Sequence, residues 1–158
     1  MVRRIVELMN EAFRRMYVHP DFSELDMRIR EAVVVREGRE YKRSVYEIYA
    51  KRTRDGSWIP ALKKMSDGQK RIVVLSLVTS LFRLSPHNVS FIILDEPTPN
   101  IDAECRRAMV ELLARTEGVE QVVIATQDES FRELARVEPR ASVYRLRHVD
   151  GRVELERL

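Results

Sequence analysis

The first apolar residues of the chain recur with the spacing of an amphipathic helix. Between residues 2 and 17 they fall at i, i+3, i+4, i+7, i+8 and i+11, with Arg and Glu at other positions. They are Ile5, Leu8, Met9, Ala12, Phe13 and Met16. Proline disfavours helical geometry in the residue before it, so His19-Pro20 is predicted to end the helix. The pattern fits either an amphipathic surface helix or the stub of a longer coiled coil.

The next part of the chain has the composition of β-structure. The predicted strands cover residues 25–29, 32–35, 45–51 and 58–62. Asp55-Gly56 lies between the last two, and an Asp-Gly pair is a strong signal for a β-hairpin. The stretch from Gly38 to Arg43 is polar and is predicted to be a connection.

Helices and strands are predicted to alternate from residue 65 onward. A helix opens at Ser66, and Gln69 three residues later completes a capping box. Its apolar residues are found on almost every side of the helix, so it is predicted to be central and buried. Pro86 is predicted to end it. The later elements are a strand over residues 91–94, a helix over 103–115 capped by Asp102, a strand over 121–125, a helix over 129–137, and a hairpin over 142–155 around Asp150-Gly151. This alternation is typical of an α/β fold with a mostly parallel sheet.

Composition narrows the class of protein only slightly. A chain of 158 residues is one domain or part of one, and an apolar fraction of 44% can fill a core. The basic residues are 23 Arg and 5 Lys, and a net charge of +3 permits contact with nucleic acid without requiring it. The single cysteine, Cys105, rules out an internal disulfide and fits a reducing cytoplasm. No apolar run approaches ~20 residues, so no membrane segment is expected.

Two adjacent carboxylates follow the most apolar strand. Phe91-Ile92-Ile93-Leu94 leads into Asp95-Glu96 and then Pro97, which predicts a strand buried on both faces with acids at its carboxyl end. Ligands of α/β folds bind at that end of the strands. Buried acids are costly unless a cation or a reacting group uses them. A magnesium ion on a nucleotide phosphate would use Asp95 as a ligand and leave Glu96 to orient water.

Three motifs follow one another at intervals of roughly 30 residues, and together they resemble a known family. They are Met65-Ser66-Asp67-Gly68-Gln69, Ile92-Ile93-Leu94-Asp95-Glu96-Pro97 running on to Thr98-Pro99-Asn100-Ile101-Asp102, and Thr126-Gln127-Asp128-Glu129. These resemble the signature, the Walker B strand with its D-loop, and the switch loop of ABC-type ATPase heads. The similarity is greatest to the coiled-coil ATPases of the SMC and Rad-fifty type, and it covers nearly the whole chain.

The resemblance implies a role for each motif. Asp95 would hold Mg²⁺, and Glu96 would orient or deprotonate the attacking water. Ser66, with the amides of Gly68 and Gln69 at a helix N-terminus, would contact the γ-phosphate of ATP bound by the opposite head. Asp102 would couple the two ATP sites of a dimer, and Lys70 with Arg71 would either relay nucleotide state or form a solvated helix face. The implied segments are a coil-proximal helix (1–18), a β-rich part (19–64) and the C-terminal ATPase lobe (65–158).

Two positions depart from the family pattern. Asp67 stands where the signature usually has glycine, which brings a negative charge near a phosphate site unless the side chain turns away. Gln127 stands where the switch loop usually has histidine. A glutamine amide can donate a hydrogen bond to phosphate but cannot transfer a proton. Slow hydrolysis or altered turnover is therefore expected.

The sequence contains no G-x-x-x-x-G-K-[ST] phosphate-binding loop. In the SMC and Rad-fifty type a long coiled coil separates the Walker A half from the C-terminal half, so the chain is expected to need a Walker A-bearing N-terminal half. The resemblance further implies a second head, DNA, an Mre-eleven type nuclease near residues 2–17, and a location at the nucleoid.

Two other functions compete with this interpretation. A transporter ATPase subunit would carry both halves in one uninterrupted domain, and the missing loop argues against it. A scaffold that binds DNA without hydrolysing ATP is favoured by Gln127. It is opposed by Glu96, because a scaffold has no need of an acid that orients water.

Overall fold

The computed structural model describes residues 2–84 and 90–158. The chain divides into two compact units, residues 1–88 and 89–158. The first unit contains α1 (Val2–Met16), β1 (Phe22–Arg36), β2 (Arg39–Arg52), β3 (Trp58–Pro60), α2 (Ala61–Lys64) and α3 (Asp67–Leu84). The second contains β4 (Phe91–Asp95), α4 (Ala103–Ala114), β5 (Gln121–Ala125), α5 (Glu129–Arg136), β6 (Tyr144–Val149) and β7 (Arg152–Arg157). None of the described helices is long and apolar enough to span a membrane.

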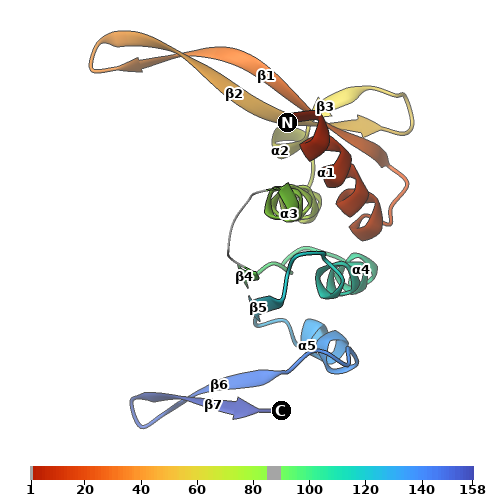
Figure 1. Ribbon diagram of the computed structural model, residues 1–158, viewed down its shortest axis with the longest axis vertical. Helices are drawn as coiled ribbons and strands as arrows, with labels where there is room; N and C mark the ends of the chain where they lie inside the picture. Colours follow the sequence, from red (N-terminus) through yellow and green to blue (C-terminus); the bar gives the residue numbers. More distant parts are fainter. Residues whose placement is uncertain (1, 85–89) are drawn as a thin grey trace. The chain divides into compact units, whose positions relative to one another are not determined.

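The core of the first unit forms where α1 packs on β1 and α3 (Figure 1). The predicted amphipathic helix is confirmed, and its apolar stripe is buried. Asn10 lies within that stripe and is also buried. Its Nδ2 donates to the carbonyls of Val6 (2.9 Å) and Leu25 (2.7 Å), and its Oδ1 accepts from the Leu25 amide (2.8 Å). One amide side chain therefore ties α1 to the start of β1.

The β-structure of the first unit differs from the prediction. Residues 25–29 and 32–35 belong to one continuous strand, β1, and the predicted polar connection from Gly38 to Arg43 is mostly the start of β2. The strands pair antiparallel from Phe22↔Arg52 to Arg36↔Arg39 around the turn at Glu37-Gly38. That turn has φ values of 51° and 74°, which suit a two-residue hairpin loop. β3 pairs with β2 as predicted, but it stops at Pro60 and is followed by the short helix α2.

The helix predicted to open at Ser66 is α3, and the prediction that it is buried holds for only one of its faces among the described residues. Its buried face contains Ile72, Val73 and Leu75, whereas Val74, Val78 and Leu81 are exposed on a second face. The described residues cover only one side of a helix that is apolar on nearly all sides. Three hydroxyls are buried along it and bond to helix carbonyls (Ser76, Thr79 and Ser80). Pro86, predicted to end this helix, lies outside the described residues.

The second unit begins with the parallel pair β4 and β5, as the α/β pattern predicts (Figure 1). Ile92 is buried, but Phe91, Ile93 and Val123 are 48%, 65% and 44% exposed. Since Ile93 pairs with Val123 in register, these side chains share one face of the sheet. The expectation of a strand buried on both faces is therefore wrong for the described residues, which cover only the other face.

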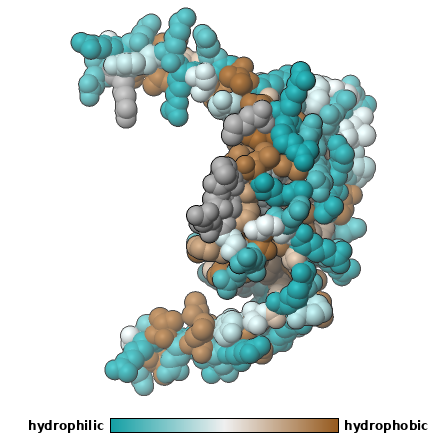
Figure 2. Space-filling view, in the orientation of Figure 1, coloured by the Kyte–Doolittle hydropathy of each residue, from teal (hydrophilic) through white to brown (hydrophobic). Residues whose placement is uncertain are grey.

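The predicted closing hairpin is β6–β7, and every residue of it is exposed. Figure 2 shows apolar side chains along this hairpin. Leu146 pairs with Leu155, and Val153 lies on the same face. Arg147 and Glu156 form an ion pair of 2.9 Å on the opposite face. One side of the hairpin is thus an exposed apolar surface.

Candidate functional site

The two predicted acids lie at the carboxyl end of β4. Asp95 pairs with Ala125 of β5 and is exposed. Glu96 is the next residue, and its amide donates to the Ala125 carbonyl at 2.8 Å. Glu96 has φ 44°, a left-handed conformation that is uncommon for a residue with a side chain. The strand therefore ends in a sharp change of chain direction at the acid predicted to be catalytic.

The carboxylate of Glu96 is held by the loop that follows β5. Its Oε1 accepts from the Gln127 amide at 3.0 Å, and its Oε2 accepts from the Thr126 hydroxyl at 3.2 Å. Both carboxylate oxygens are therefore held by consecutive residues of that loop. The structure thus brings together Glu96 and Gln127, the two residues that the resemblance names as catalytic.

An open pocket adjoins this carboxylate. It is lined by Glu96, Thr98, Pro99, Gln127 and Asp128. Two of the three predicted motifs meet there, because the lining comes from the Walker B segment with its D-loop and from the switch loop. A carboxylate and an amide side chain facing open space can orient water and donate a hydrogen bond to an anion. Asp95, as a neighbouring exposed carboxylate, is of the ligand class that Mg²⁺ prefers.

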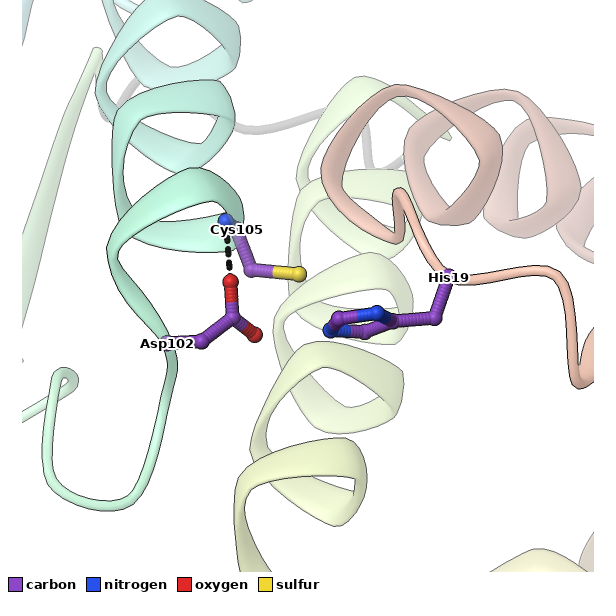
Figure 3. Close-up of side chains that lie close together, drawn as sticks. All are labelled: His19, Asp102 and Cys105. Carbon is purple, nitrogen blue, oxygen red and sulfur yellow. Dashed lines mark hydrogen bonds between the residues drawn. The ribbon is translucent and has the colours of Figure 1, made fainter.

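Asp102 caps α4, as predicted. Its carboxylate accepts from the amides of Glu104 (3.1 Å) and Cys105 (2.9 Å), and Figure 3 shows the bond to Cys105. The cap fixes the turn that connects Pro97 to α4, in which the Ile101 amide donates to the Thr98 carbonyl. The role of Asp102 in coupling two ATP sites stays a prediction.

The predicted signature begins α3 in the first unit, and its capping box is confirmed. The Ser66 amide donates to Gln69 Oε1 at 2.9 Å, and the Gln69 amide donates to Ser66 Oγ at 3.3 Å. The Ser66 hydroxyl proton is not used in this box. Gly68 is buried in the first turn. The carboxylate of Asp67 pairs with Lys70 Nζ at 3.0 Å, which offsets the negative charge beside the helix N-terminus.

Several residues that organise these motifs were not predicted from the sequence. Gln69 Nε2 donates to the Tyr17 hydroxyl (2.8 Å) and to Asp21 (3.0 Å), which anchors the signature to the segment after α1. The hydroxyl oxygens of Thr98 and Thr126 lie 3.1 Å apart and share a hydrogen bond. These partners are far apart in sequence, and only the folded chain brings them together.

Asp128, next to Gln127, accepts hydrogen bonds from both α4 and α5. Its carboxylate accepts from the amides of Ser130 and Phe131, which begin α5, and from the guanidinium of Arg106 on α4. Burial raises the pKa of Asp128, but the hydrogen bonds from Ser130, Arg106 and Phe131 hold it below its ordinary value. The residue after Gln127 is therefore fixed as an anion that joins two helices.

Comparison with known proteins places the chain in a family. No family model matches the chain. It is 31% identical over 137 residues to Arcadin-4 of Pyrobaculum calidifontis, and 32% identical over 139 residues to the DNA double-strand break repair Rad50 ATPase of Aeropyrum pernix. Each match covers 84% of this chain, but only 16% and 15% of those proteins. The chain therefore spans about a sixth of the length of these relatives.

Solved structures agree on the fold. A chain from a study of ATP-driven dimerization and DNA-stimulated activation of SMC ATPases superposes with a TM-score of 0.69 at 17% identity, covering 99% of this chain and 84% of that one. The SMC head domain of Thermotoga maritima superposes with a TM-score of 0.61 at 17% identity, covering 99% and 48%. From its sequence relatives and its fold, the chain is a C-terminal segment of an SMC/Rad50-type ABC ATPase head.

Proposed function

We propose that the chain supplies the signature, Walker B, D-loop and switch segments of an ATP-hydrolysing head. The observation that supports this most directly is the placement of Glu96. Its two carboxylate oxygens accept from consecutive residues of the switch loop, beside an open pocket. A carboxylate that is fixed in this way and lines an open pocket has the properties required of a residue that orients a nucleophile.

The proposed reaction is hydrolysis of the γ-phosphate of ATP. The water oxygen forms a bond to the γ-phosphorus, and the bond from that phosphorus to the ADP oxygen breaks with its electron pair leaving on ADP. Glu96 accepts a proton from the water, and the Gln127 side chain donates a hydrogen bond to a γ-phosphate oxygen. Asp95 is the residue that would hold Mg²⁺, an ion that offsets phosphate charge when bound.

The signature is proposed to serve a second ATP molecule. Ser66 would donate its hydroxyl proton to the γ-phosphate bound by the opposite head, since the capping box leaves that proton available. The amides of Gly68 and Gln69 lie at the N-terminal end of α3, where the helix dipole favours an anion. Asp102 would transmit the state of one ATP site to the other across the pair of heads.

A Walker A-bearing half is proposed to complete the head. Three apolar surfaces support this. They are the face of β4–β5 with Phe91, Ile93 and Val123, the face of α3 with Val74, Val78 and Leu81, and the face of β6–β7 with Leu146, Val153 and Leu155. Clusters of exposed apolar side chains are typical of faces that another chain segment covers. The missing half would belong to the same gene or to a separate chain.

The cellular role is proposed from the relatives. The Rad50 ATPases that match this chain are named for DNA double-strand break repair. A completed pair of heads would act in break repair or chromosome organisation at the nucleoid, on DNA, with an Mre-eleven type nuclease bound near α1. DNA binding of this kind depends on basic residues, so it should weaken steeply with salt.

The test is ATP hydrolysis by the chain combined with a Walker A-bearing half. Wild-type chain should release phosphate only when that half is present. Glu96→Gln should abolish turnover and accumulate ATP-bound head dimers, which size-exclusion chromatography with light scattering would detect. The matched control is Glu111→Gln on an exposed part of α4, which should leave turnover unchanged. Absence of hydrolysis by the wild-type assembly would contradict the proposal.

A scaffold that does not hydrolyse ATP is the second candidate, and Gln127 favours it. Gln127 lines the pocket where the family usually has a histidine. In that case the assembly would bind ATP and DNA without releasing phosphate, and Glu96→Gln would leave its behaviour unchanged. The same variant therefore separates the two functions.

A further inference from the structure

The hydroxyl of Thr126 makes three hydrogen bonds, and their directions can be assigned. It donates to Glu96 Oε2 at 3.2 Å and accepts from the Asp128 amide at 3.1 Å. Its third contact is with the Thr98 hydroxyl at 3.1 Å. A threonine hydroxyl has one proton to donate and two lone pairs to accept. Since the proton of Thr126 points to the carboxylate, Thr98 must be the donor in the third bond.

Thr98 is well placed to fix this direction. Its side chain is buried, with 1% of the residue exposed. It follows Pro97, and its carbonyl accepts from the Ile101 amide at 3.1 Å in the turn that leads to the Asp102 cap. The position of the Thr98 hydroxyl therefore depends on the conformation of the D-loop turn.

We propose that Thr126 is a positioning residue for Glu96 and that Thr98 makes this positioning depend on the D-loop. The hydroxyl of Thr98 donates to Thr126, Thr126 donates to Glu96, and the Gln127 amide holds the other carboxylate oxygen. A shift of the D-loop turn breaks the first bond. Thr126 then loses the bond from Thr98 that helps to orient its hydroxyl, which weakens its hold on Glu96 Oε2. The inference rests on the proposed ATPase function.

The sequence alone does not indicate that Thr98 and Thr126 act together to position Glu96. Thr98 adjoins the Walker B motif and Thr126 precedes Gln127, but nothing in their spacing pairs them. Both belong to one compact unit, and β4 and β5 bring them together because Asp95 and Ala125 are in register. The D-loop turn and the switch loop each start within three residues of that pair.

The first experiment measures hydrogen exchange in the chain without nucleotide. Thr126→Val removes the hydroxyl and keeps the shape, and Thr126→Ser keeps the hydroxyl. The Asp128 amide donates to Thr126, and the Gln127 amide donates to Glu96, so both should exchange at least about tenfold faster in Thr126→Val. Thr126→Ser should retain wild-type exchange. Equal exchange in the two variants would overturn the inference, and this result does not depend on any ATPase activity.

The second experiment measures kinetics in the assembly completed by the Walker A-bearing half. Thr126→Val should lower kcat by at least about tenfold with KM nearly unchanged, because it affects the orientation of the water and not ATP binding. Thr126→Ser should restore kcat. Thr98→Val should also lower kcat, Thr98→Ser should not, and the double valine variant should be no worse than Thr126→Val. Additive effects of the two valines, or equal effects of valine and serine, would overturn the inference.

These outcomes are distinguishable from failure of the proposed function. If the wild-type assembly releases no phosphate, the proposed function fails, while hydrogen exchange still decides whether Thr126 restrains the 127–128 segment. If the wild-type assembly is active and Thr126→Val is equally active, the function stands and the positioning role is wrong.

Discussion

Arg106 of α4 donates to the carboxylate of Asp128, the residue that caps α5. Both side chains are about four-fifths buried, and Arg106 also donates to the Ser130 hydroxyl in the first turn of α5. Asp128 directly follows Gln127, whose amide holds Glu96. One ion pair therefore joins α4, α5 and the loop that restrains the candidate catalytic acid.

Removing this ion pair should destabilise the second unit. Asp128→Ala loses both the helix cap and the partner of a guanidinium that is about four-fifths buried, so we expect a loss of about 2 kcal/mol in the free energy of unfolding. Asp128→Asn should cost about 1 kcal/mol, because asparagine still caps a helix. Urea unfolding followed by circular dichroism measures both. Glu111→Ala, on the exposed face of α4, should change stability by less than about 0.5 kcal/mol.

The stabilisation from Asp128 should depend on pH. Its pKa is lowered in the folded chain, so the unfolded state binds the proton more readily. The contribution is then fully present above the unfolded pKa of about 3.9 and is lost as pH falls through the lower folded value. The stability difference between wild type and Asp128→Asn should stay constant from about pH 5 upward and shrink below about pH 4. The same comparison in an Arg106→Met background should show a smaller change, and an unchanged one would contradict the role of Arg106.

Asn10 provides the third prediction. Its side chain satisfies the amide and the carbonyl of Leu25 inside the core of the first unit. Asn10→Ala leaves both backbone groups buried without these partners, so it should cost about 2–4 kcal/mol. Arg14→Ala on the exposed face of the same helix is the control and should change stability by less than about 0.5 kcal/mol. A small loss for Asn10→Ala would show that water replaces these bonds.

The sequence correctly predicted elements that bury only one face and that begin or turn at residues typical of helix caps and hairpin turns. The amphipathic stripe gave α1, and Ser66, Asp102 and Gly151 marked the start of two helices and the turn of a hairpin. The acids at 95 and 96 were placed at a strand end because a long apolar run precedes them. These features depend on neighbours in sequence, which is why they could be predicted.

The features that were missed depend on contacts between distant residues. The β1–β2 hairpin was predicted as fragments because Ala32-Val33-Val34-Val35 does not alternate and Glu37 does not look like a turn residue. Asn10 was overlooked because a polar residue in an apolar stripe carries no sign of its partner. The exposed faces of α3 and β4 were predicted as buried, since apolar composition shows that a face needs cover but not which chain covers it.

The turn of the long hairpin gives the fourth prediction. Glu37 has φ 51° and Gly38 has φ 74°, so both residues are left-handed. Glutamate is strained there, whereas Asn-Gly is the preferred pair for such a turn. Glu37→Asn should therefore raise stability by about 0.5–1 kcal/mol. Gly38→Ala should lower it by about 1 kcal/mol, because a Cβ is disfavoured at that φ. Thermal unfolding measures both, and an equal gain from Glu37→Ala would contradict the explanation.

The side chain of Gln127 gives the last prediction. Its backbone amide holds Glu96, and a substitution of the side chain keeps that bond, while the side chain itself lines the pocket. Gln127→His would place an imidazole there, which can carry a proton and a positive charge near pH 6.5, roughly its ordinary pKa. In the completed assembly kcat should rise by at least about tenfold, with a new dependence on pH near that value. Gln127→Asn is the matched control, because it keeps an amide and adds no titrating group. A rate that is the same for glutamine and histidine at every pH would mean that this position does not limit hydrolysis.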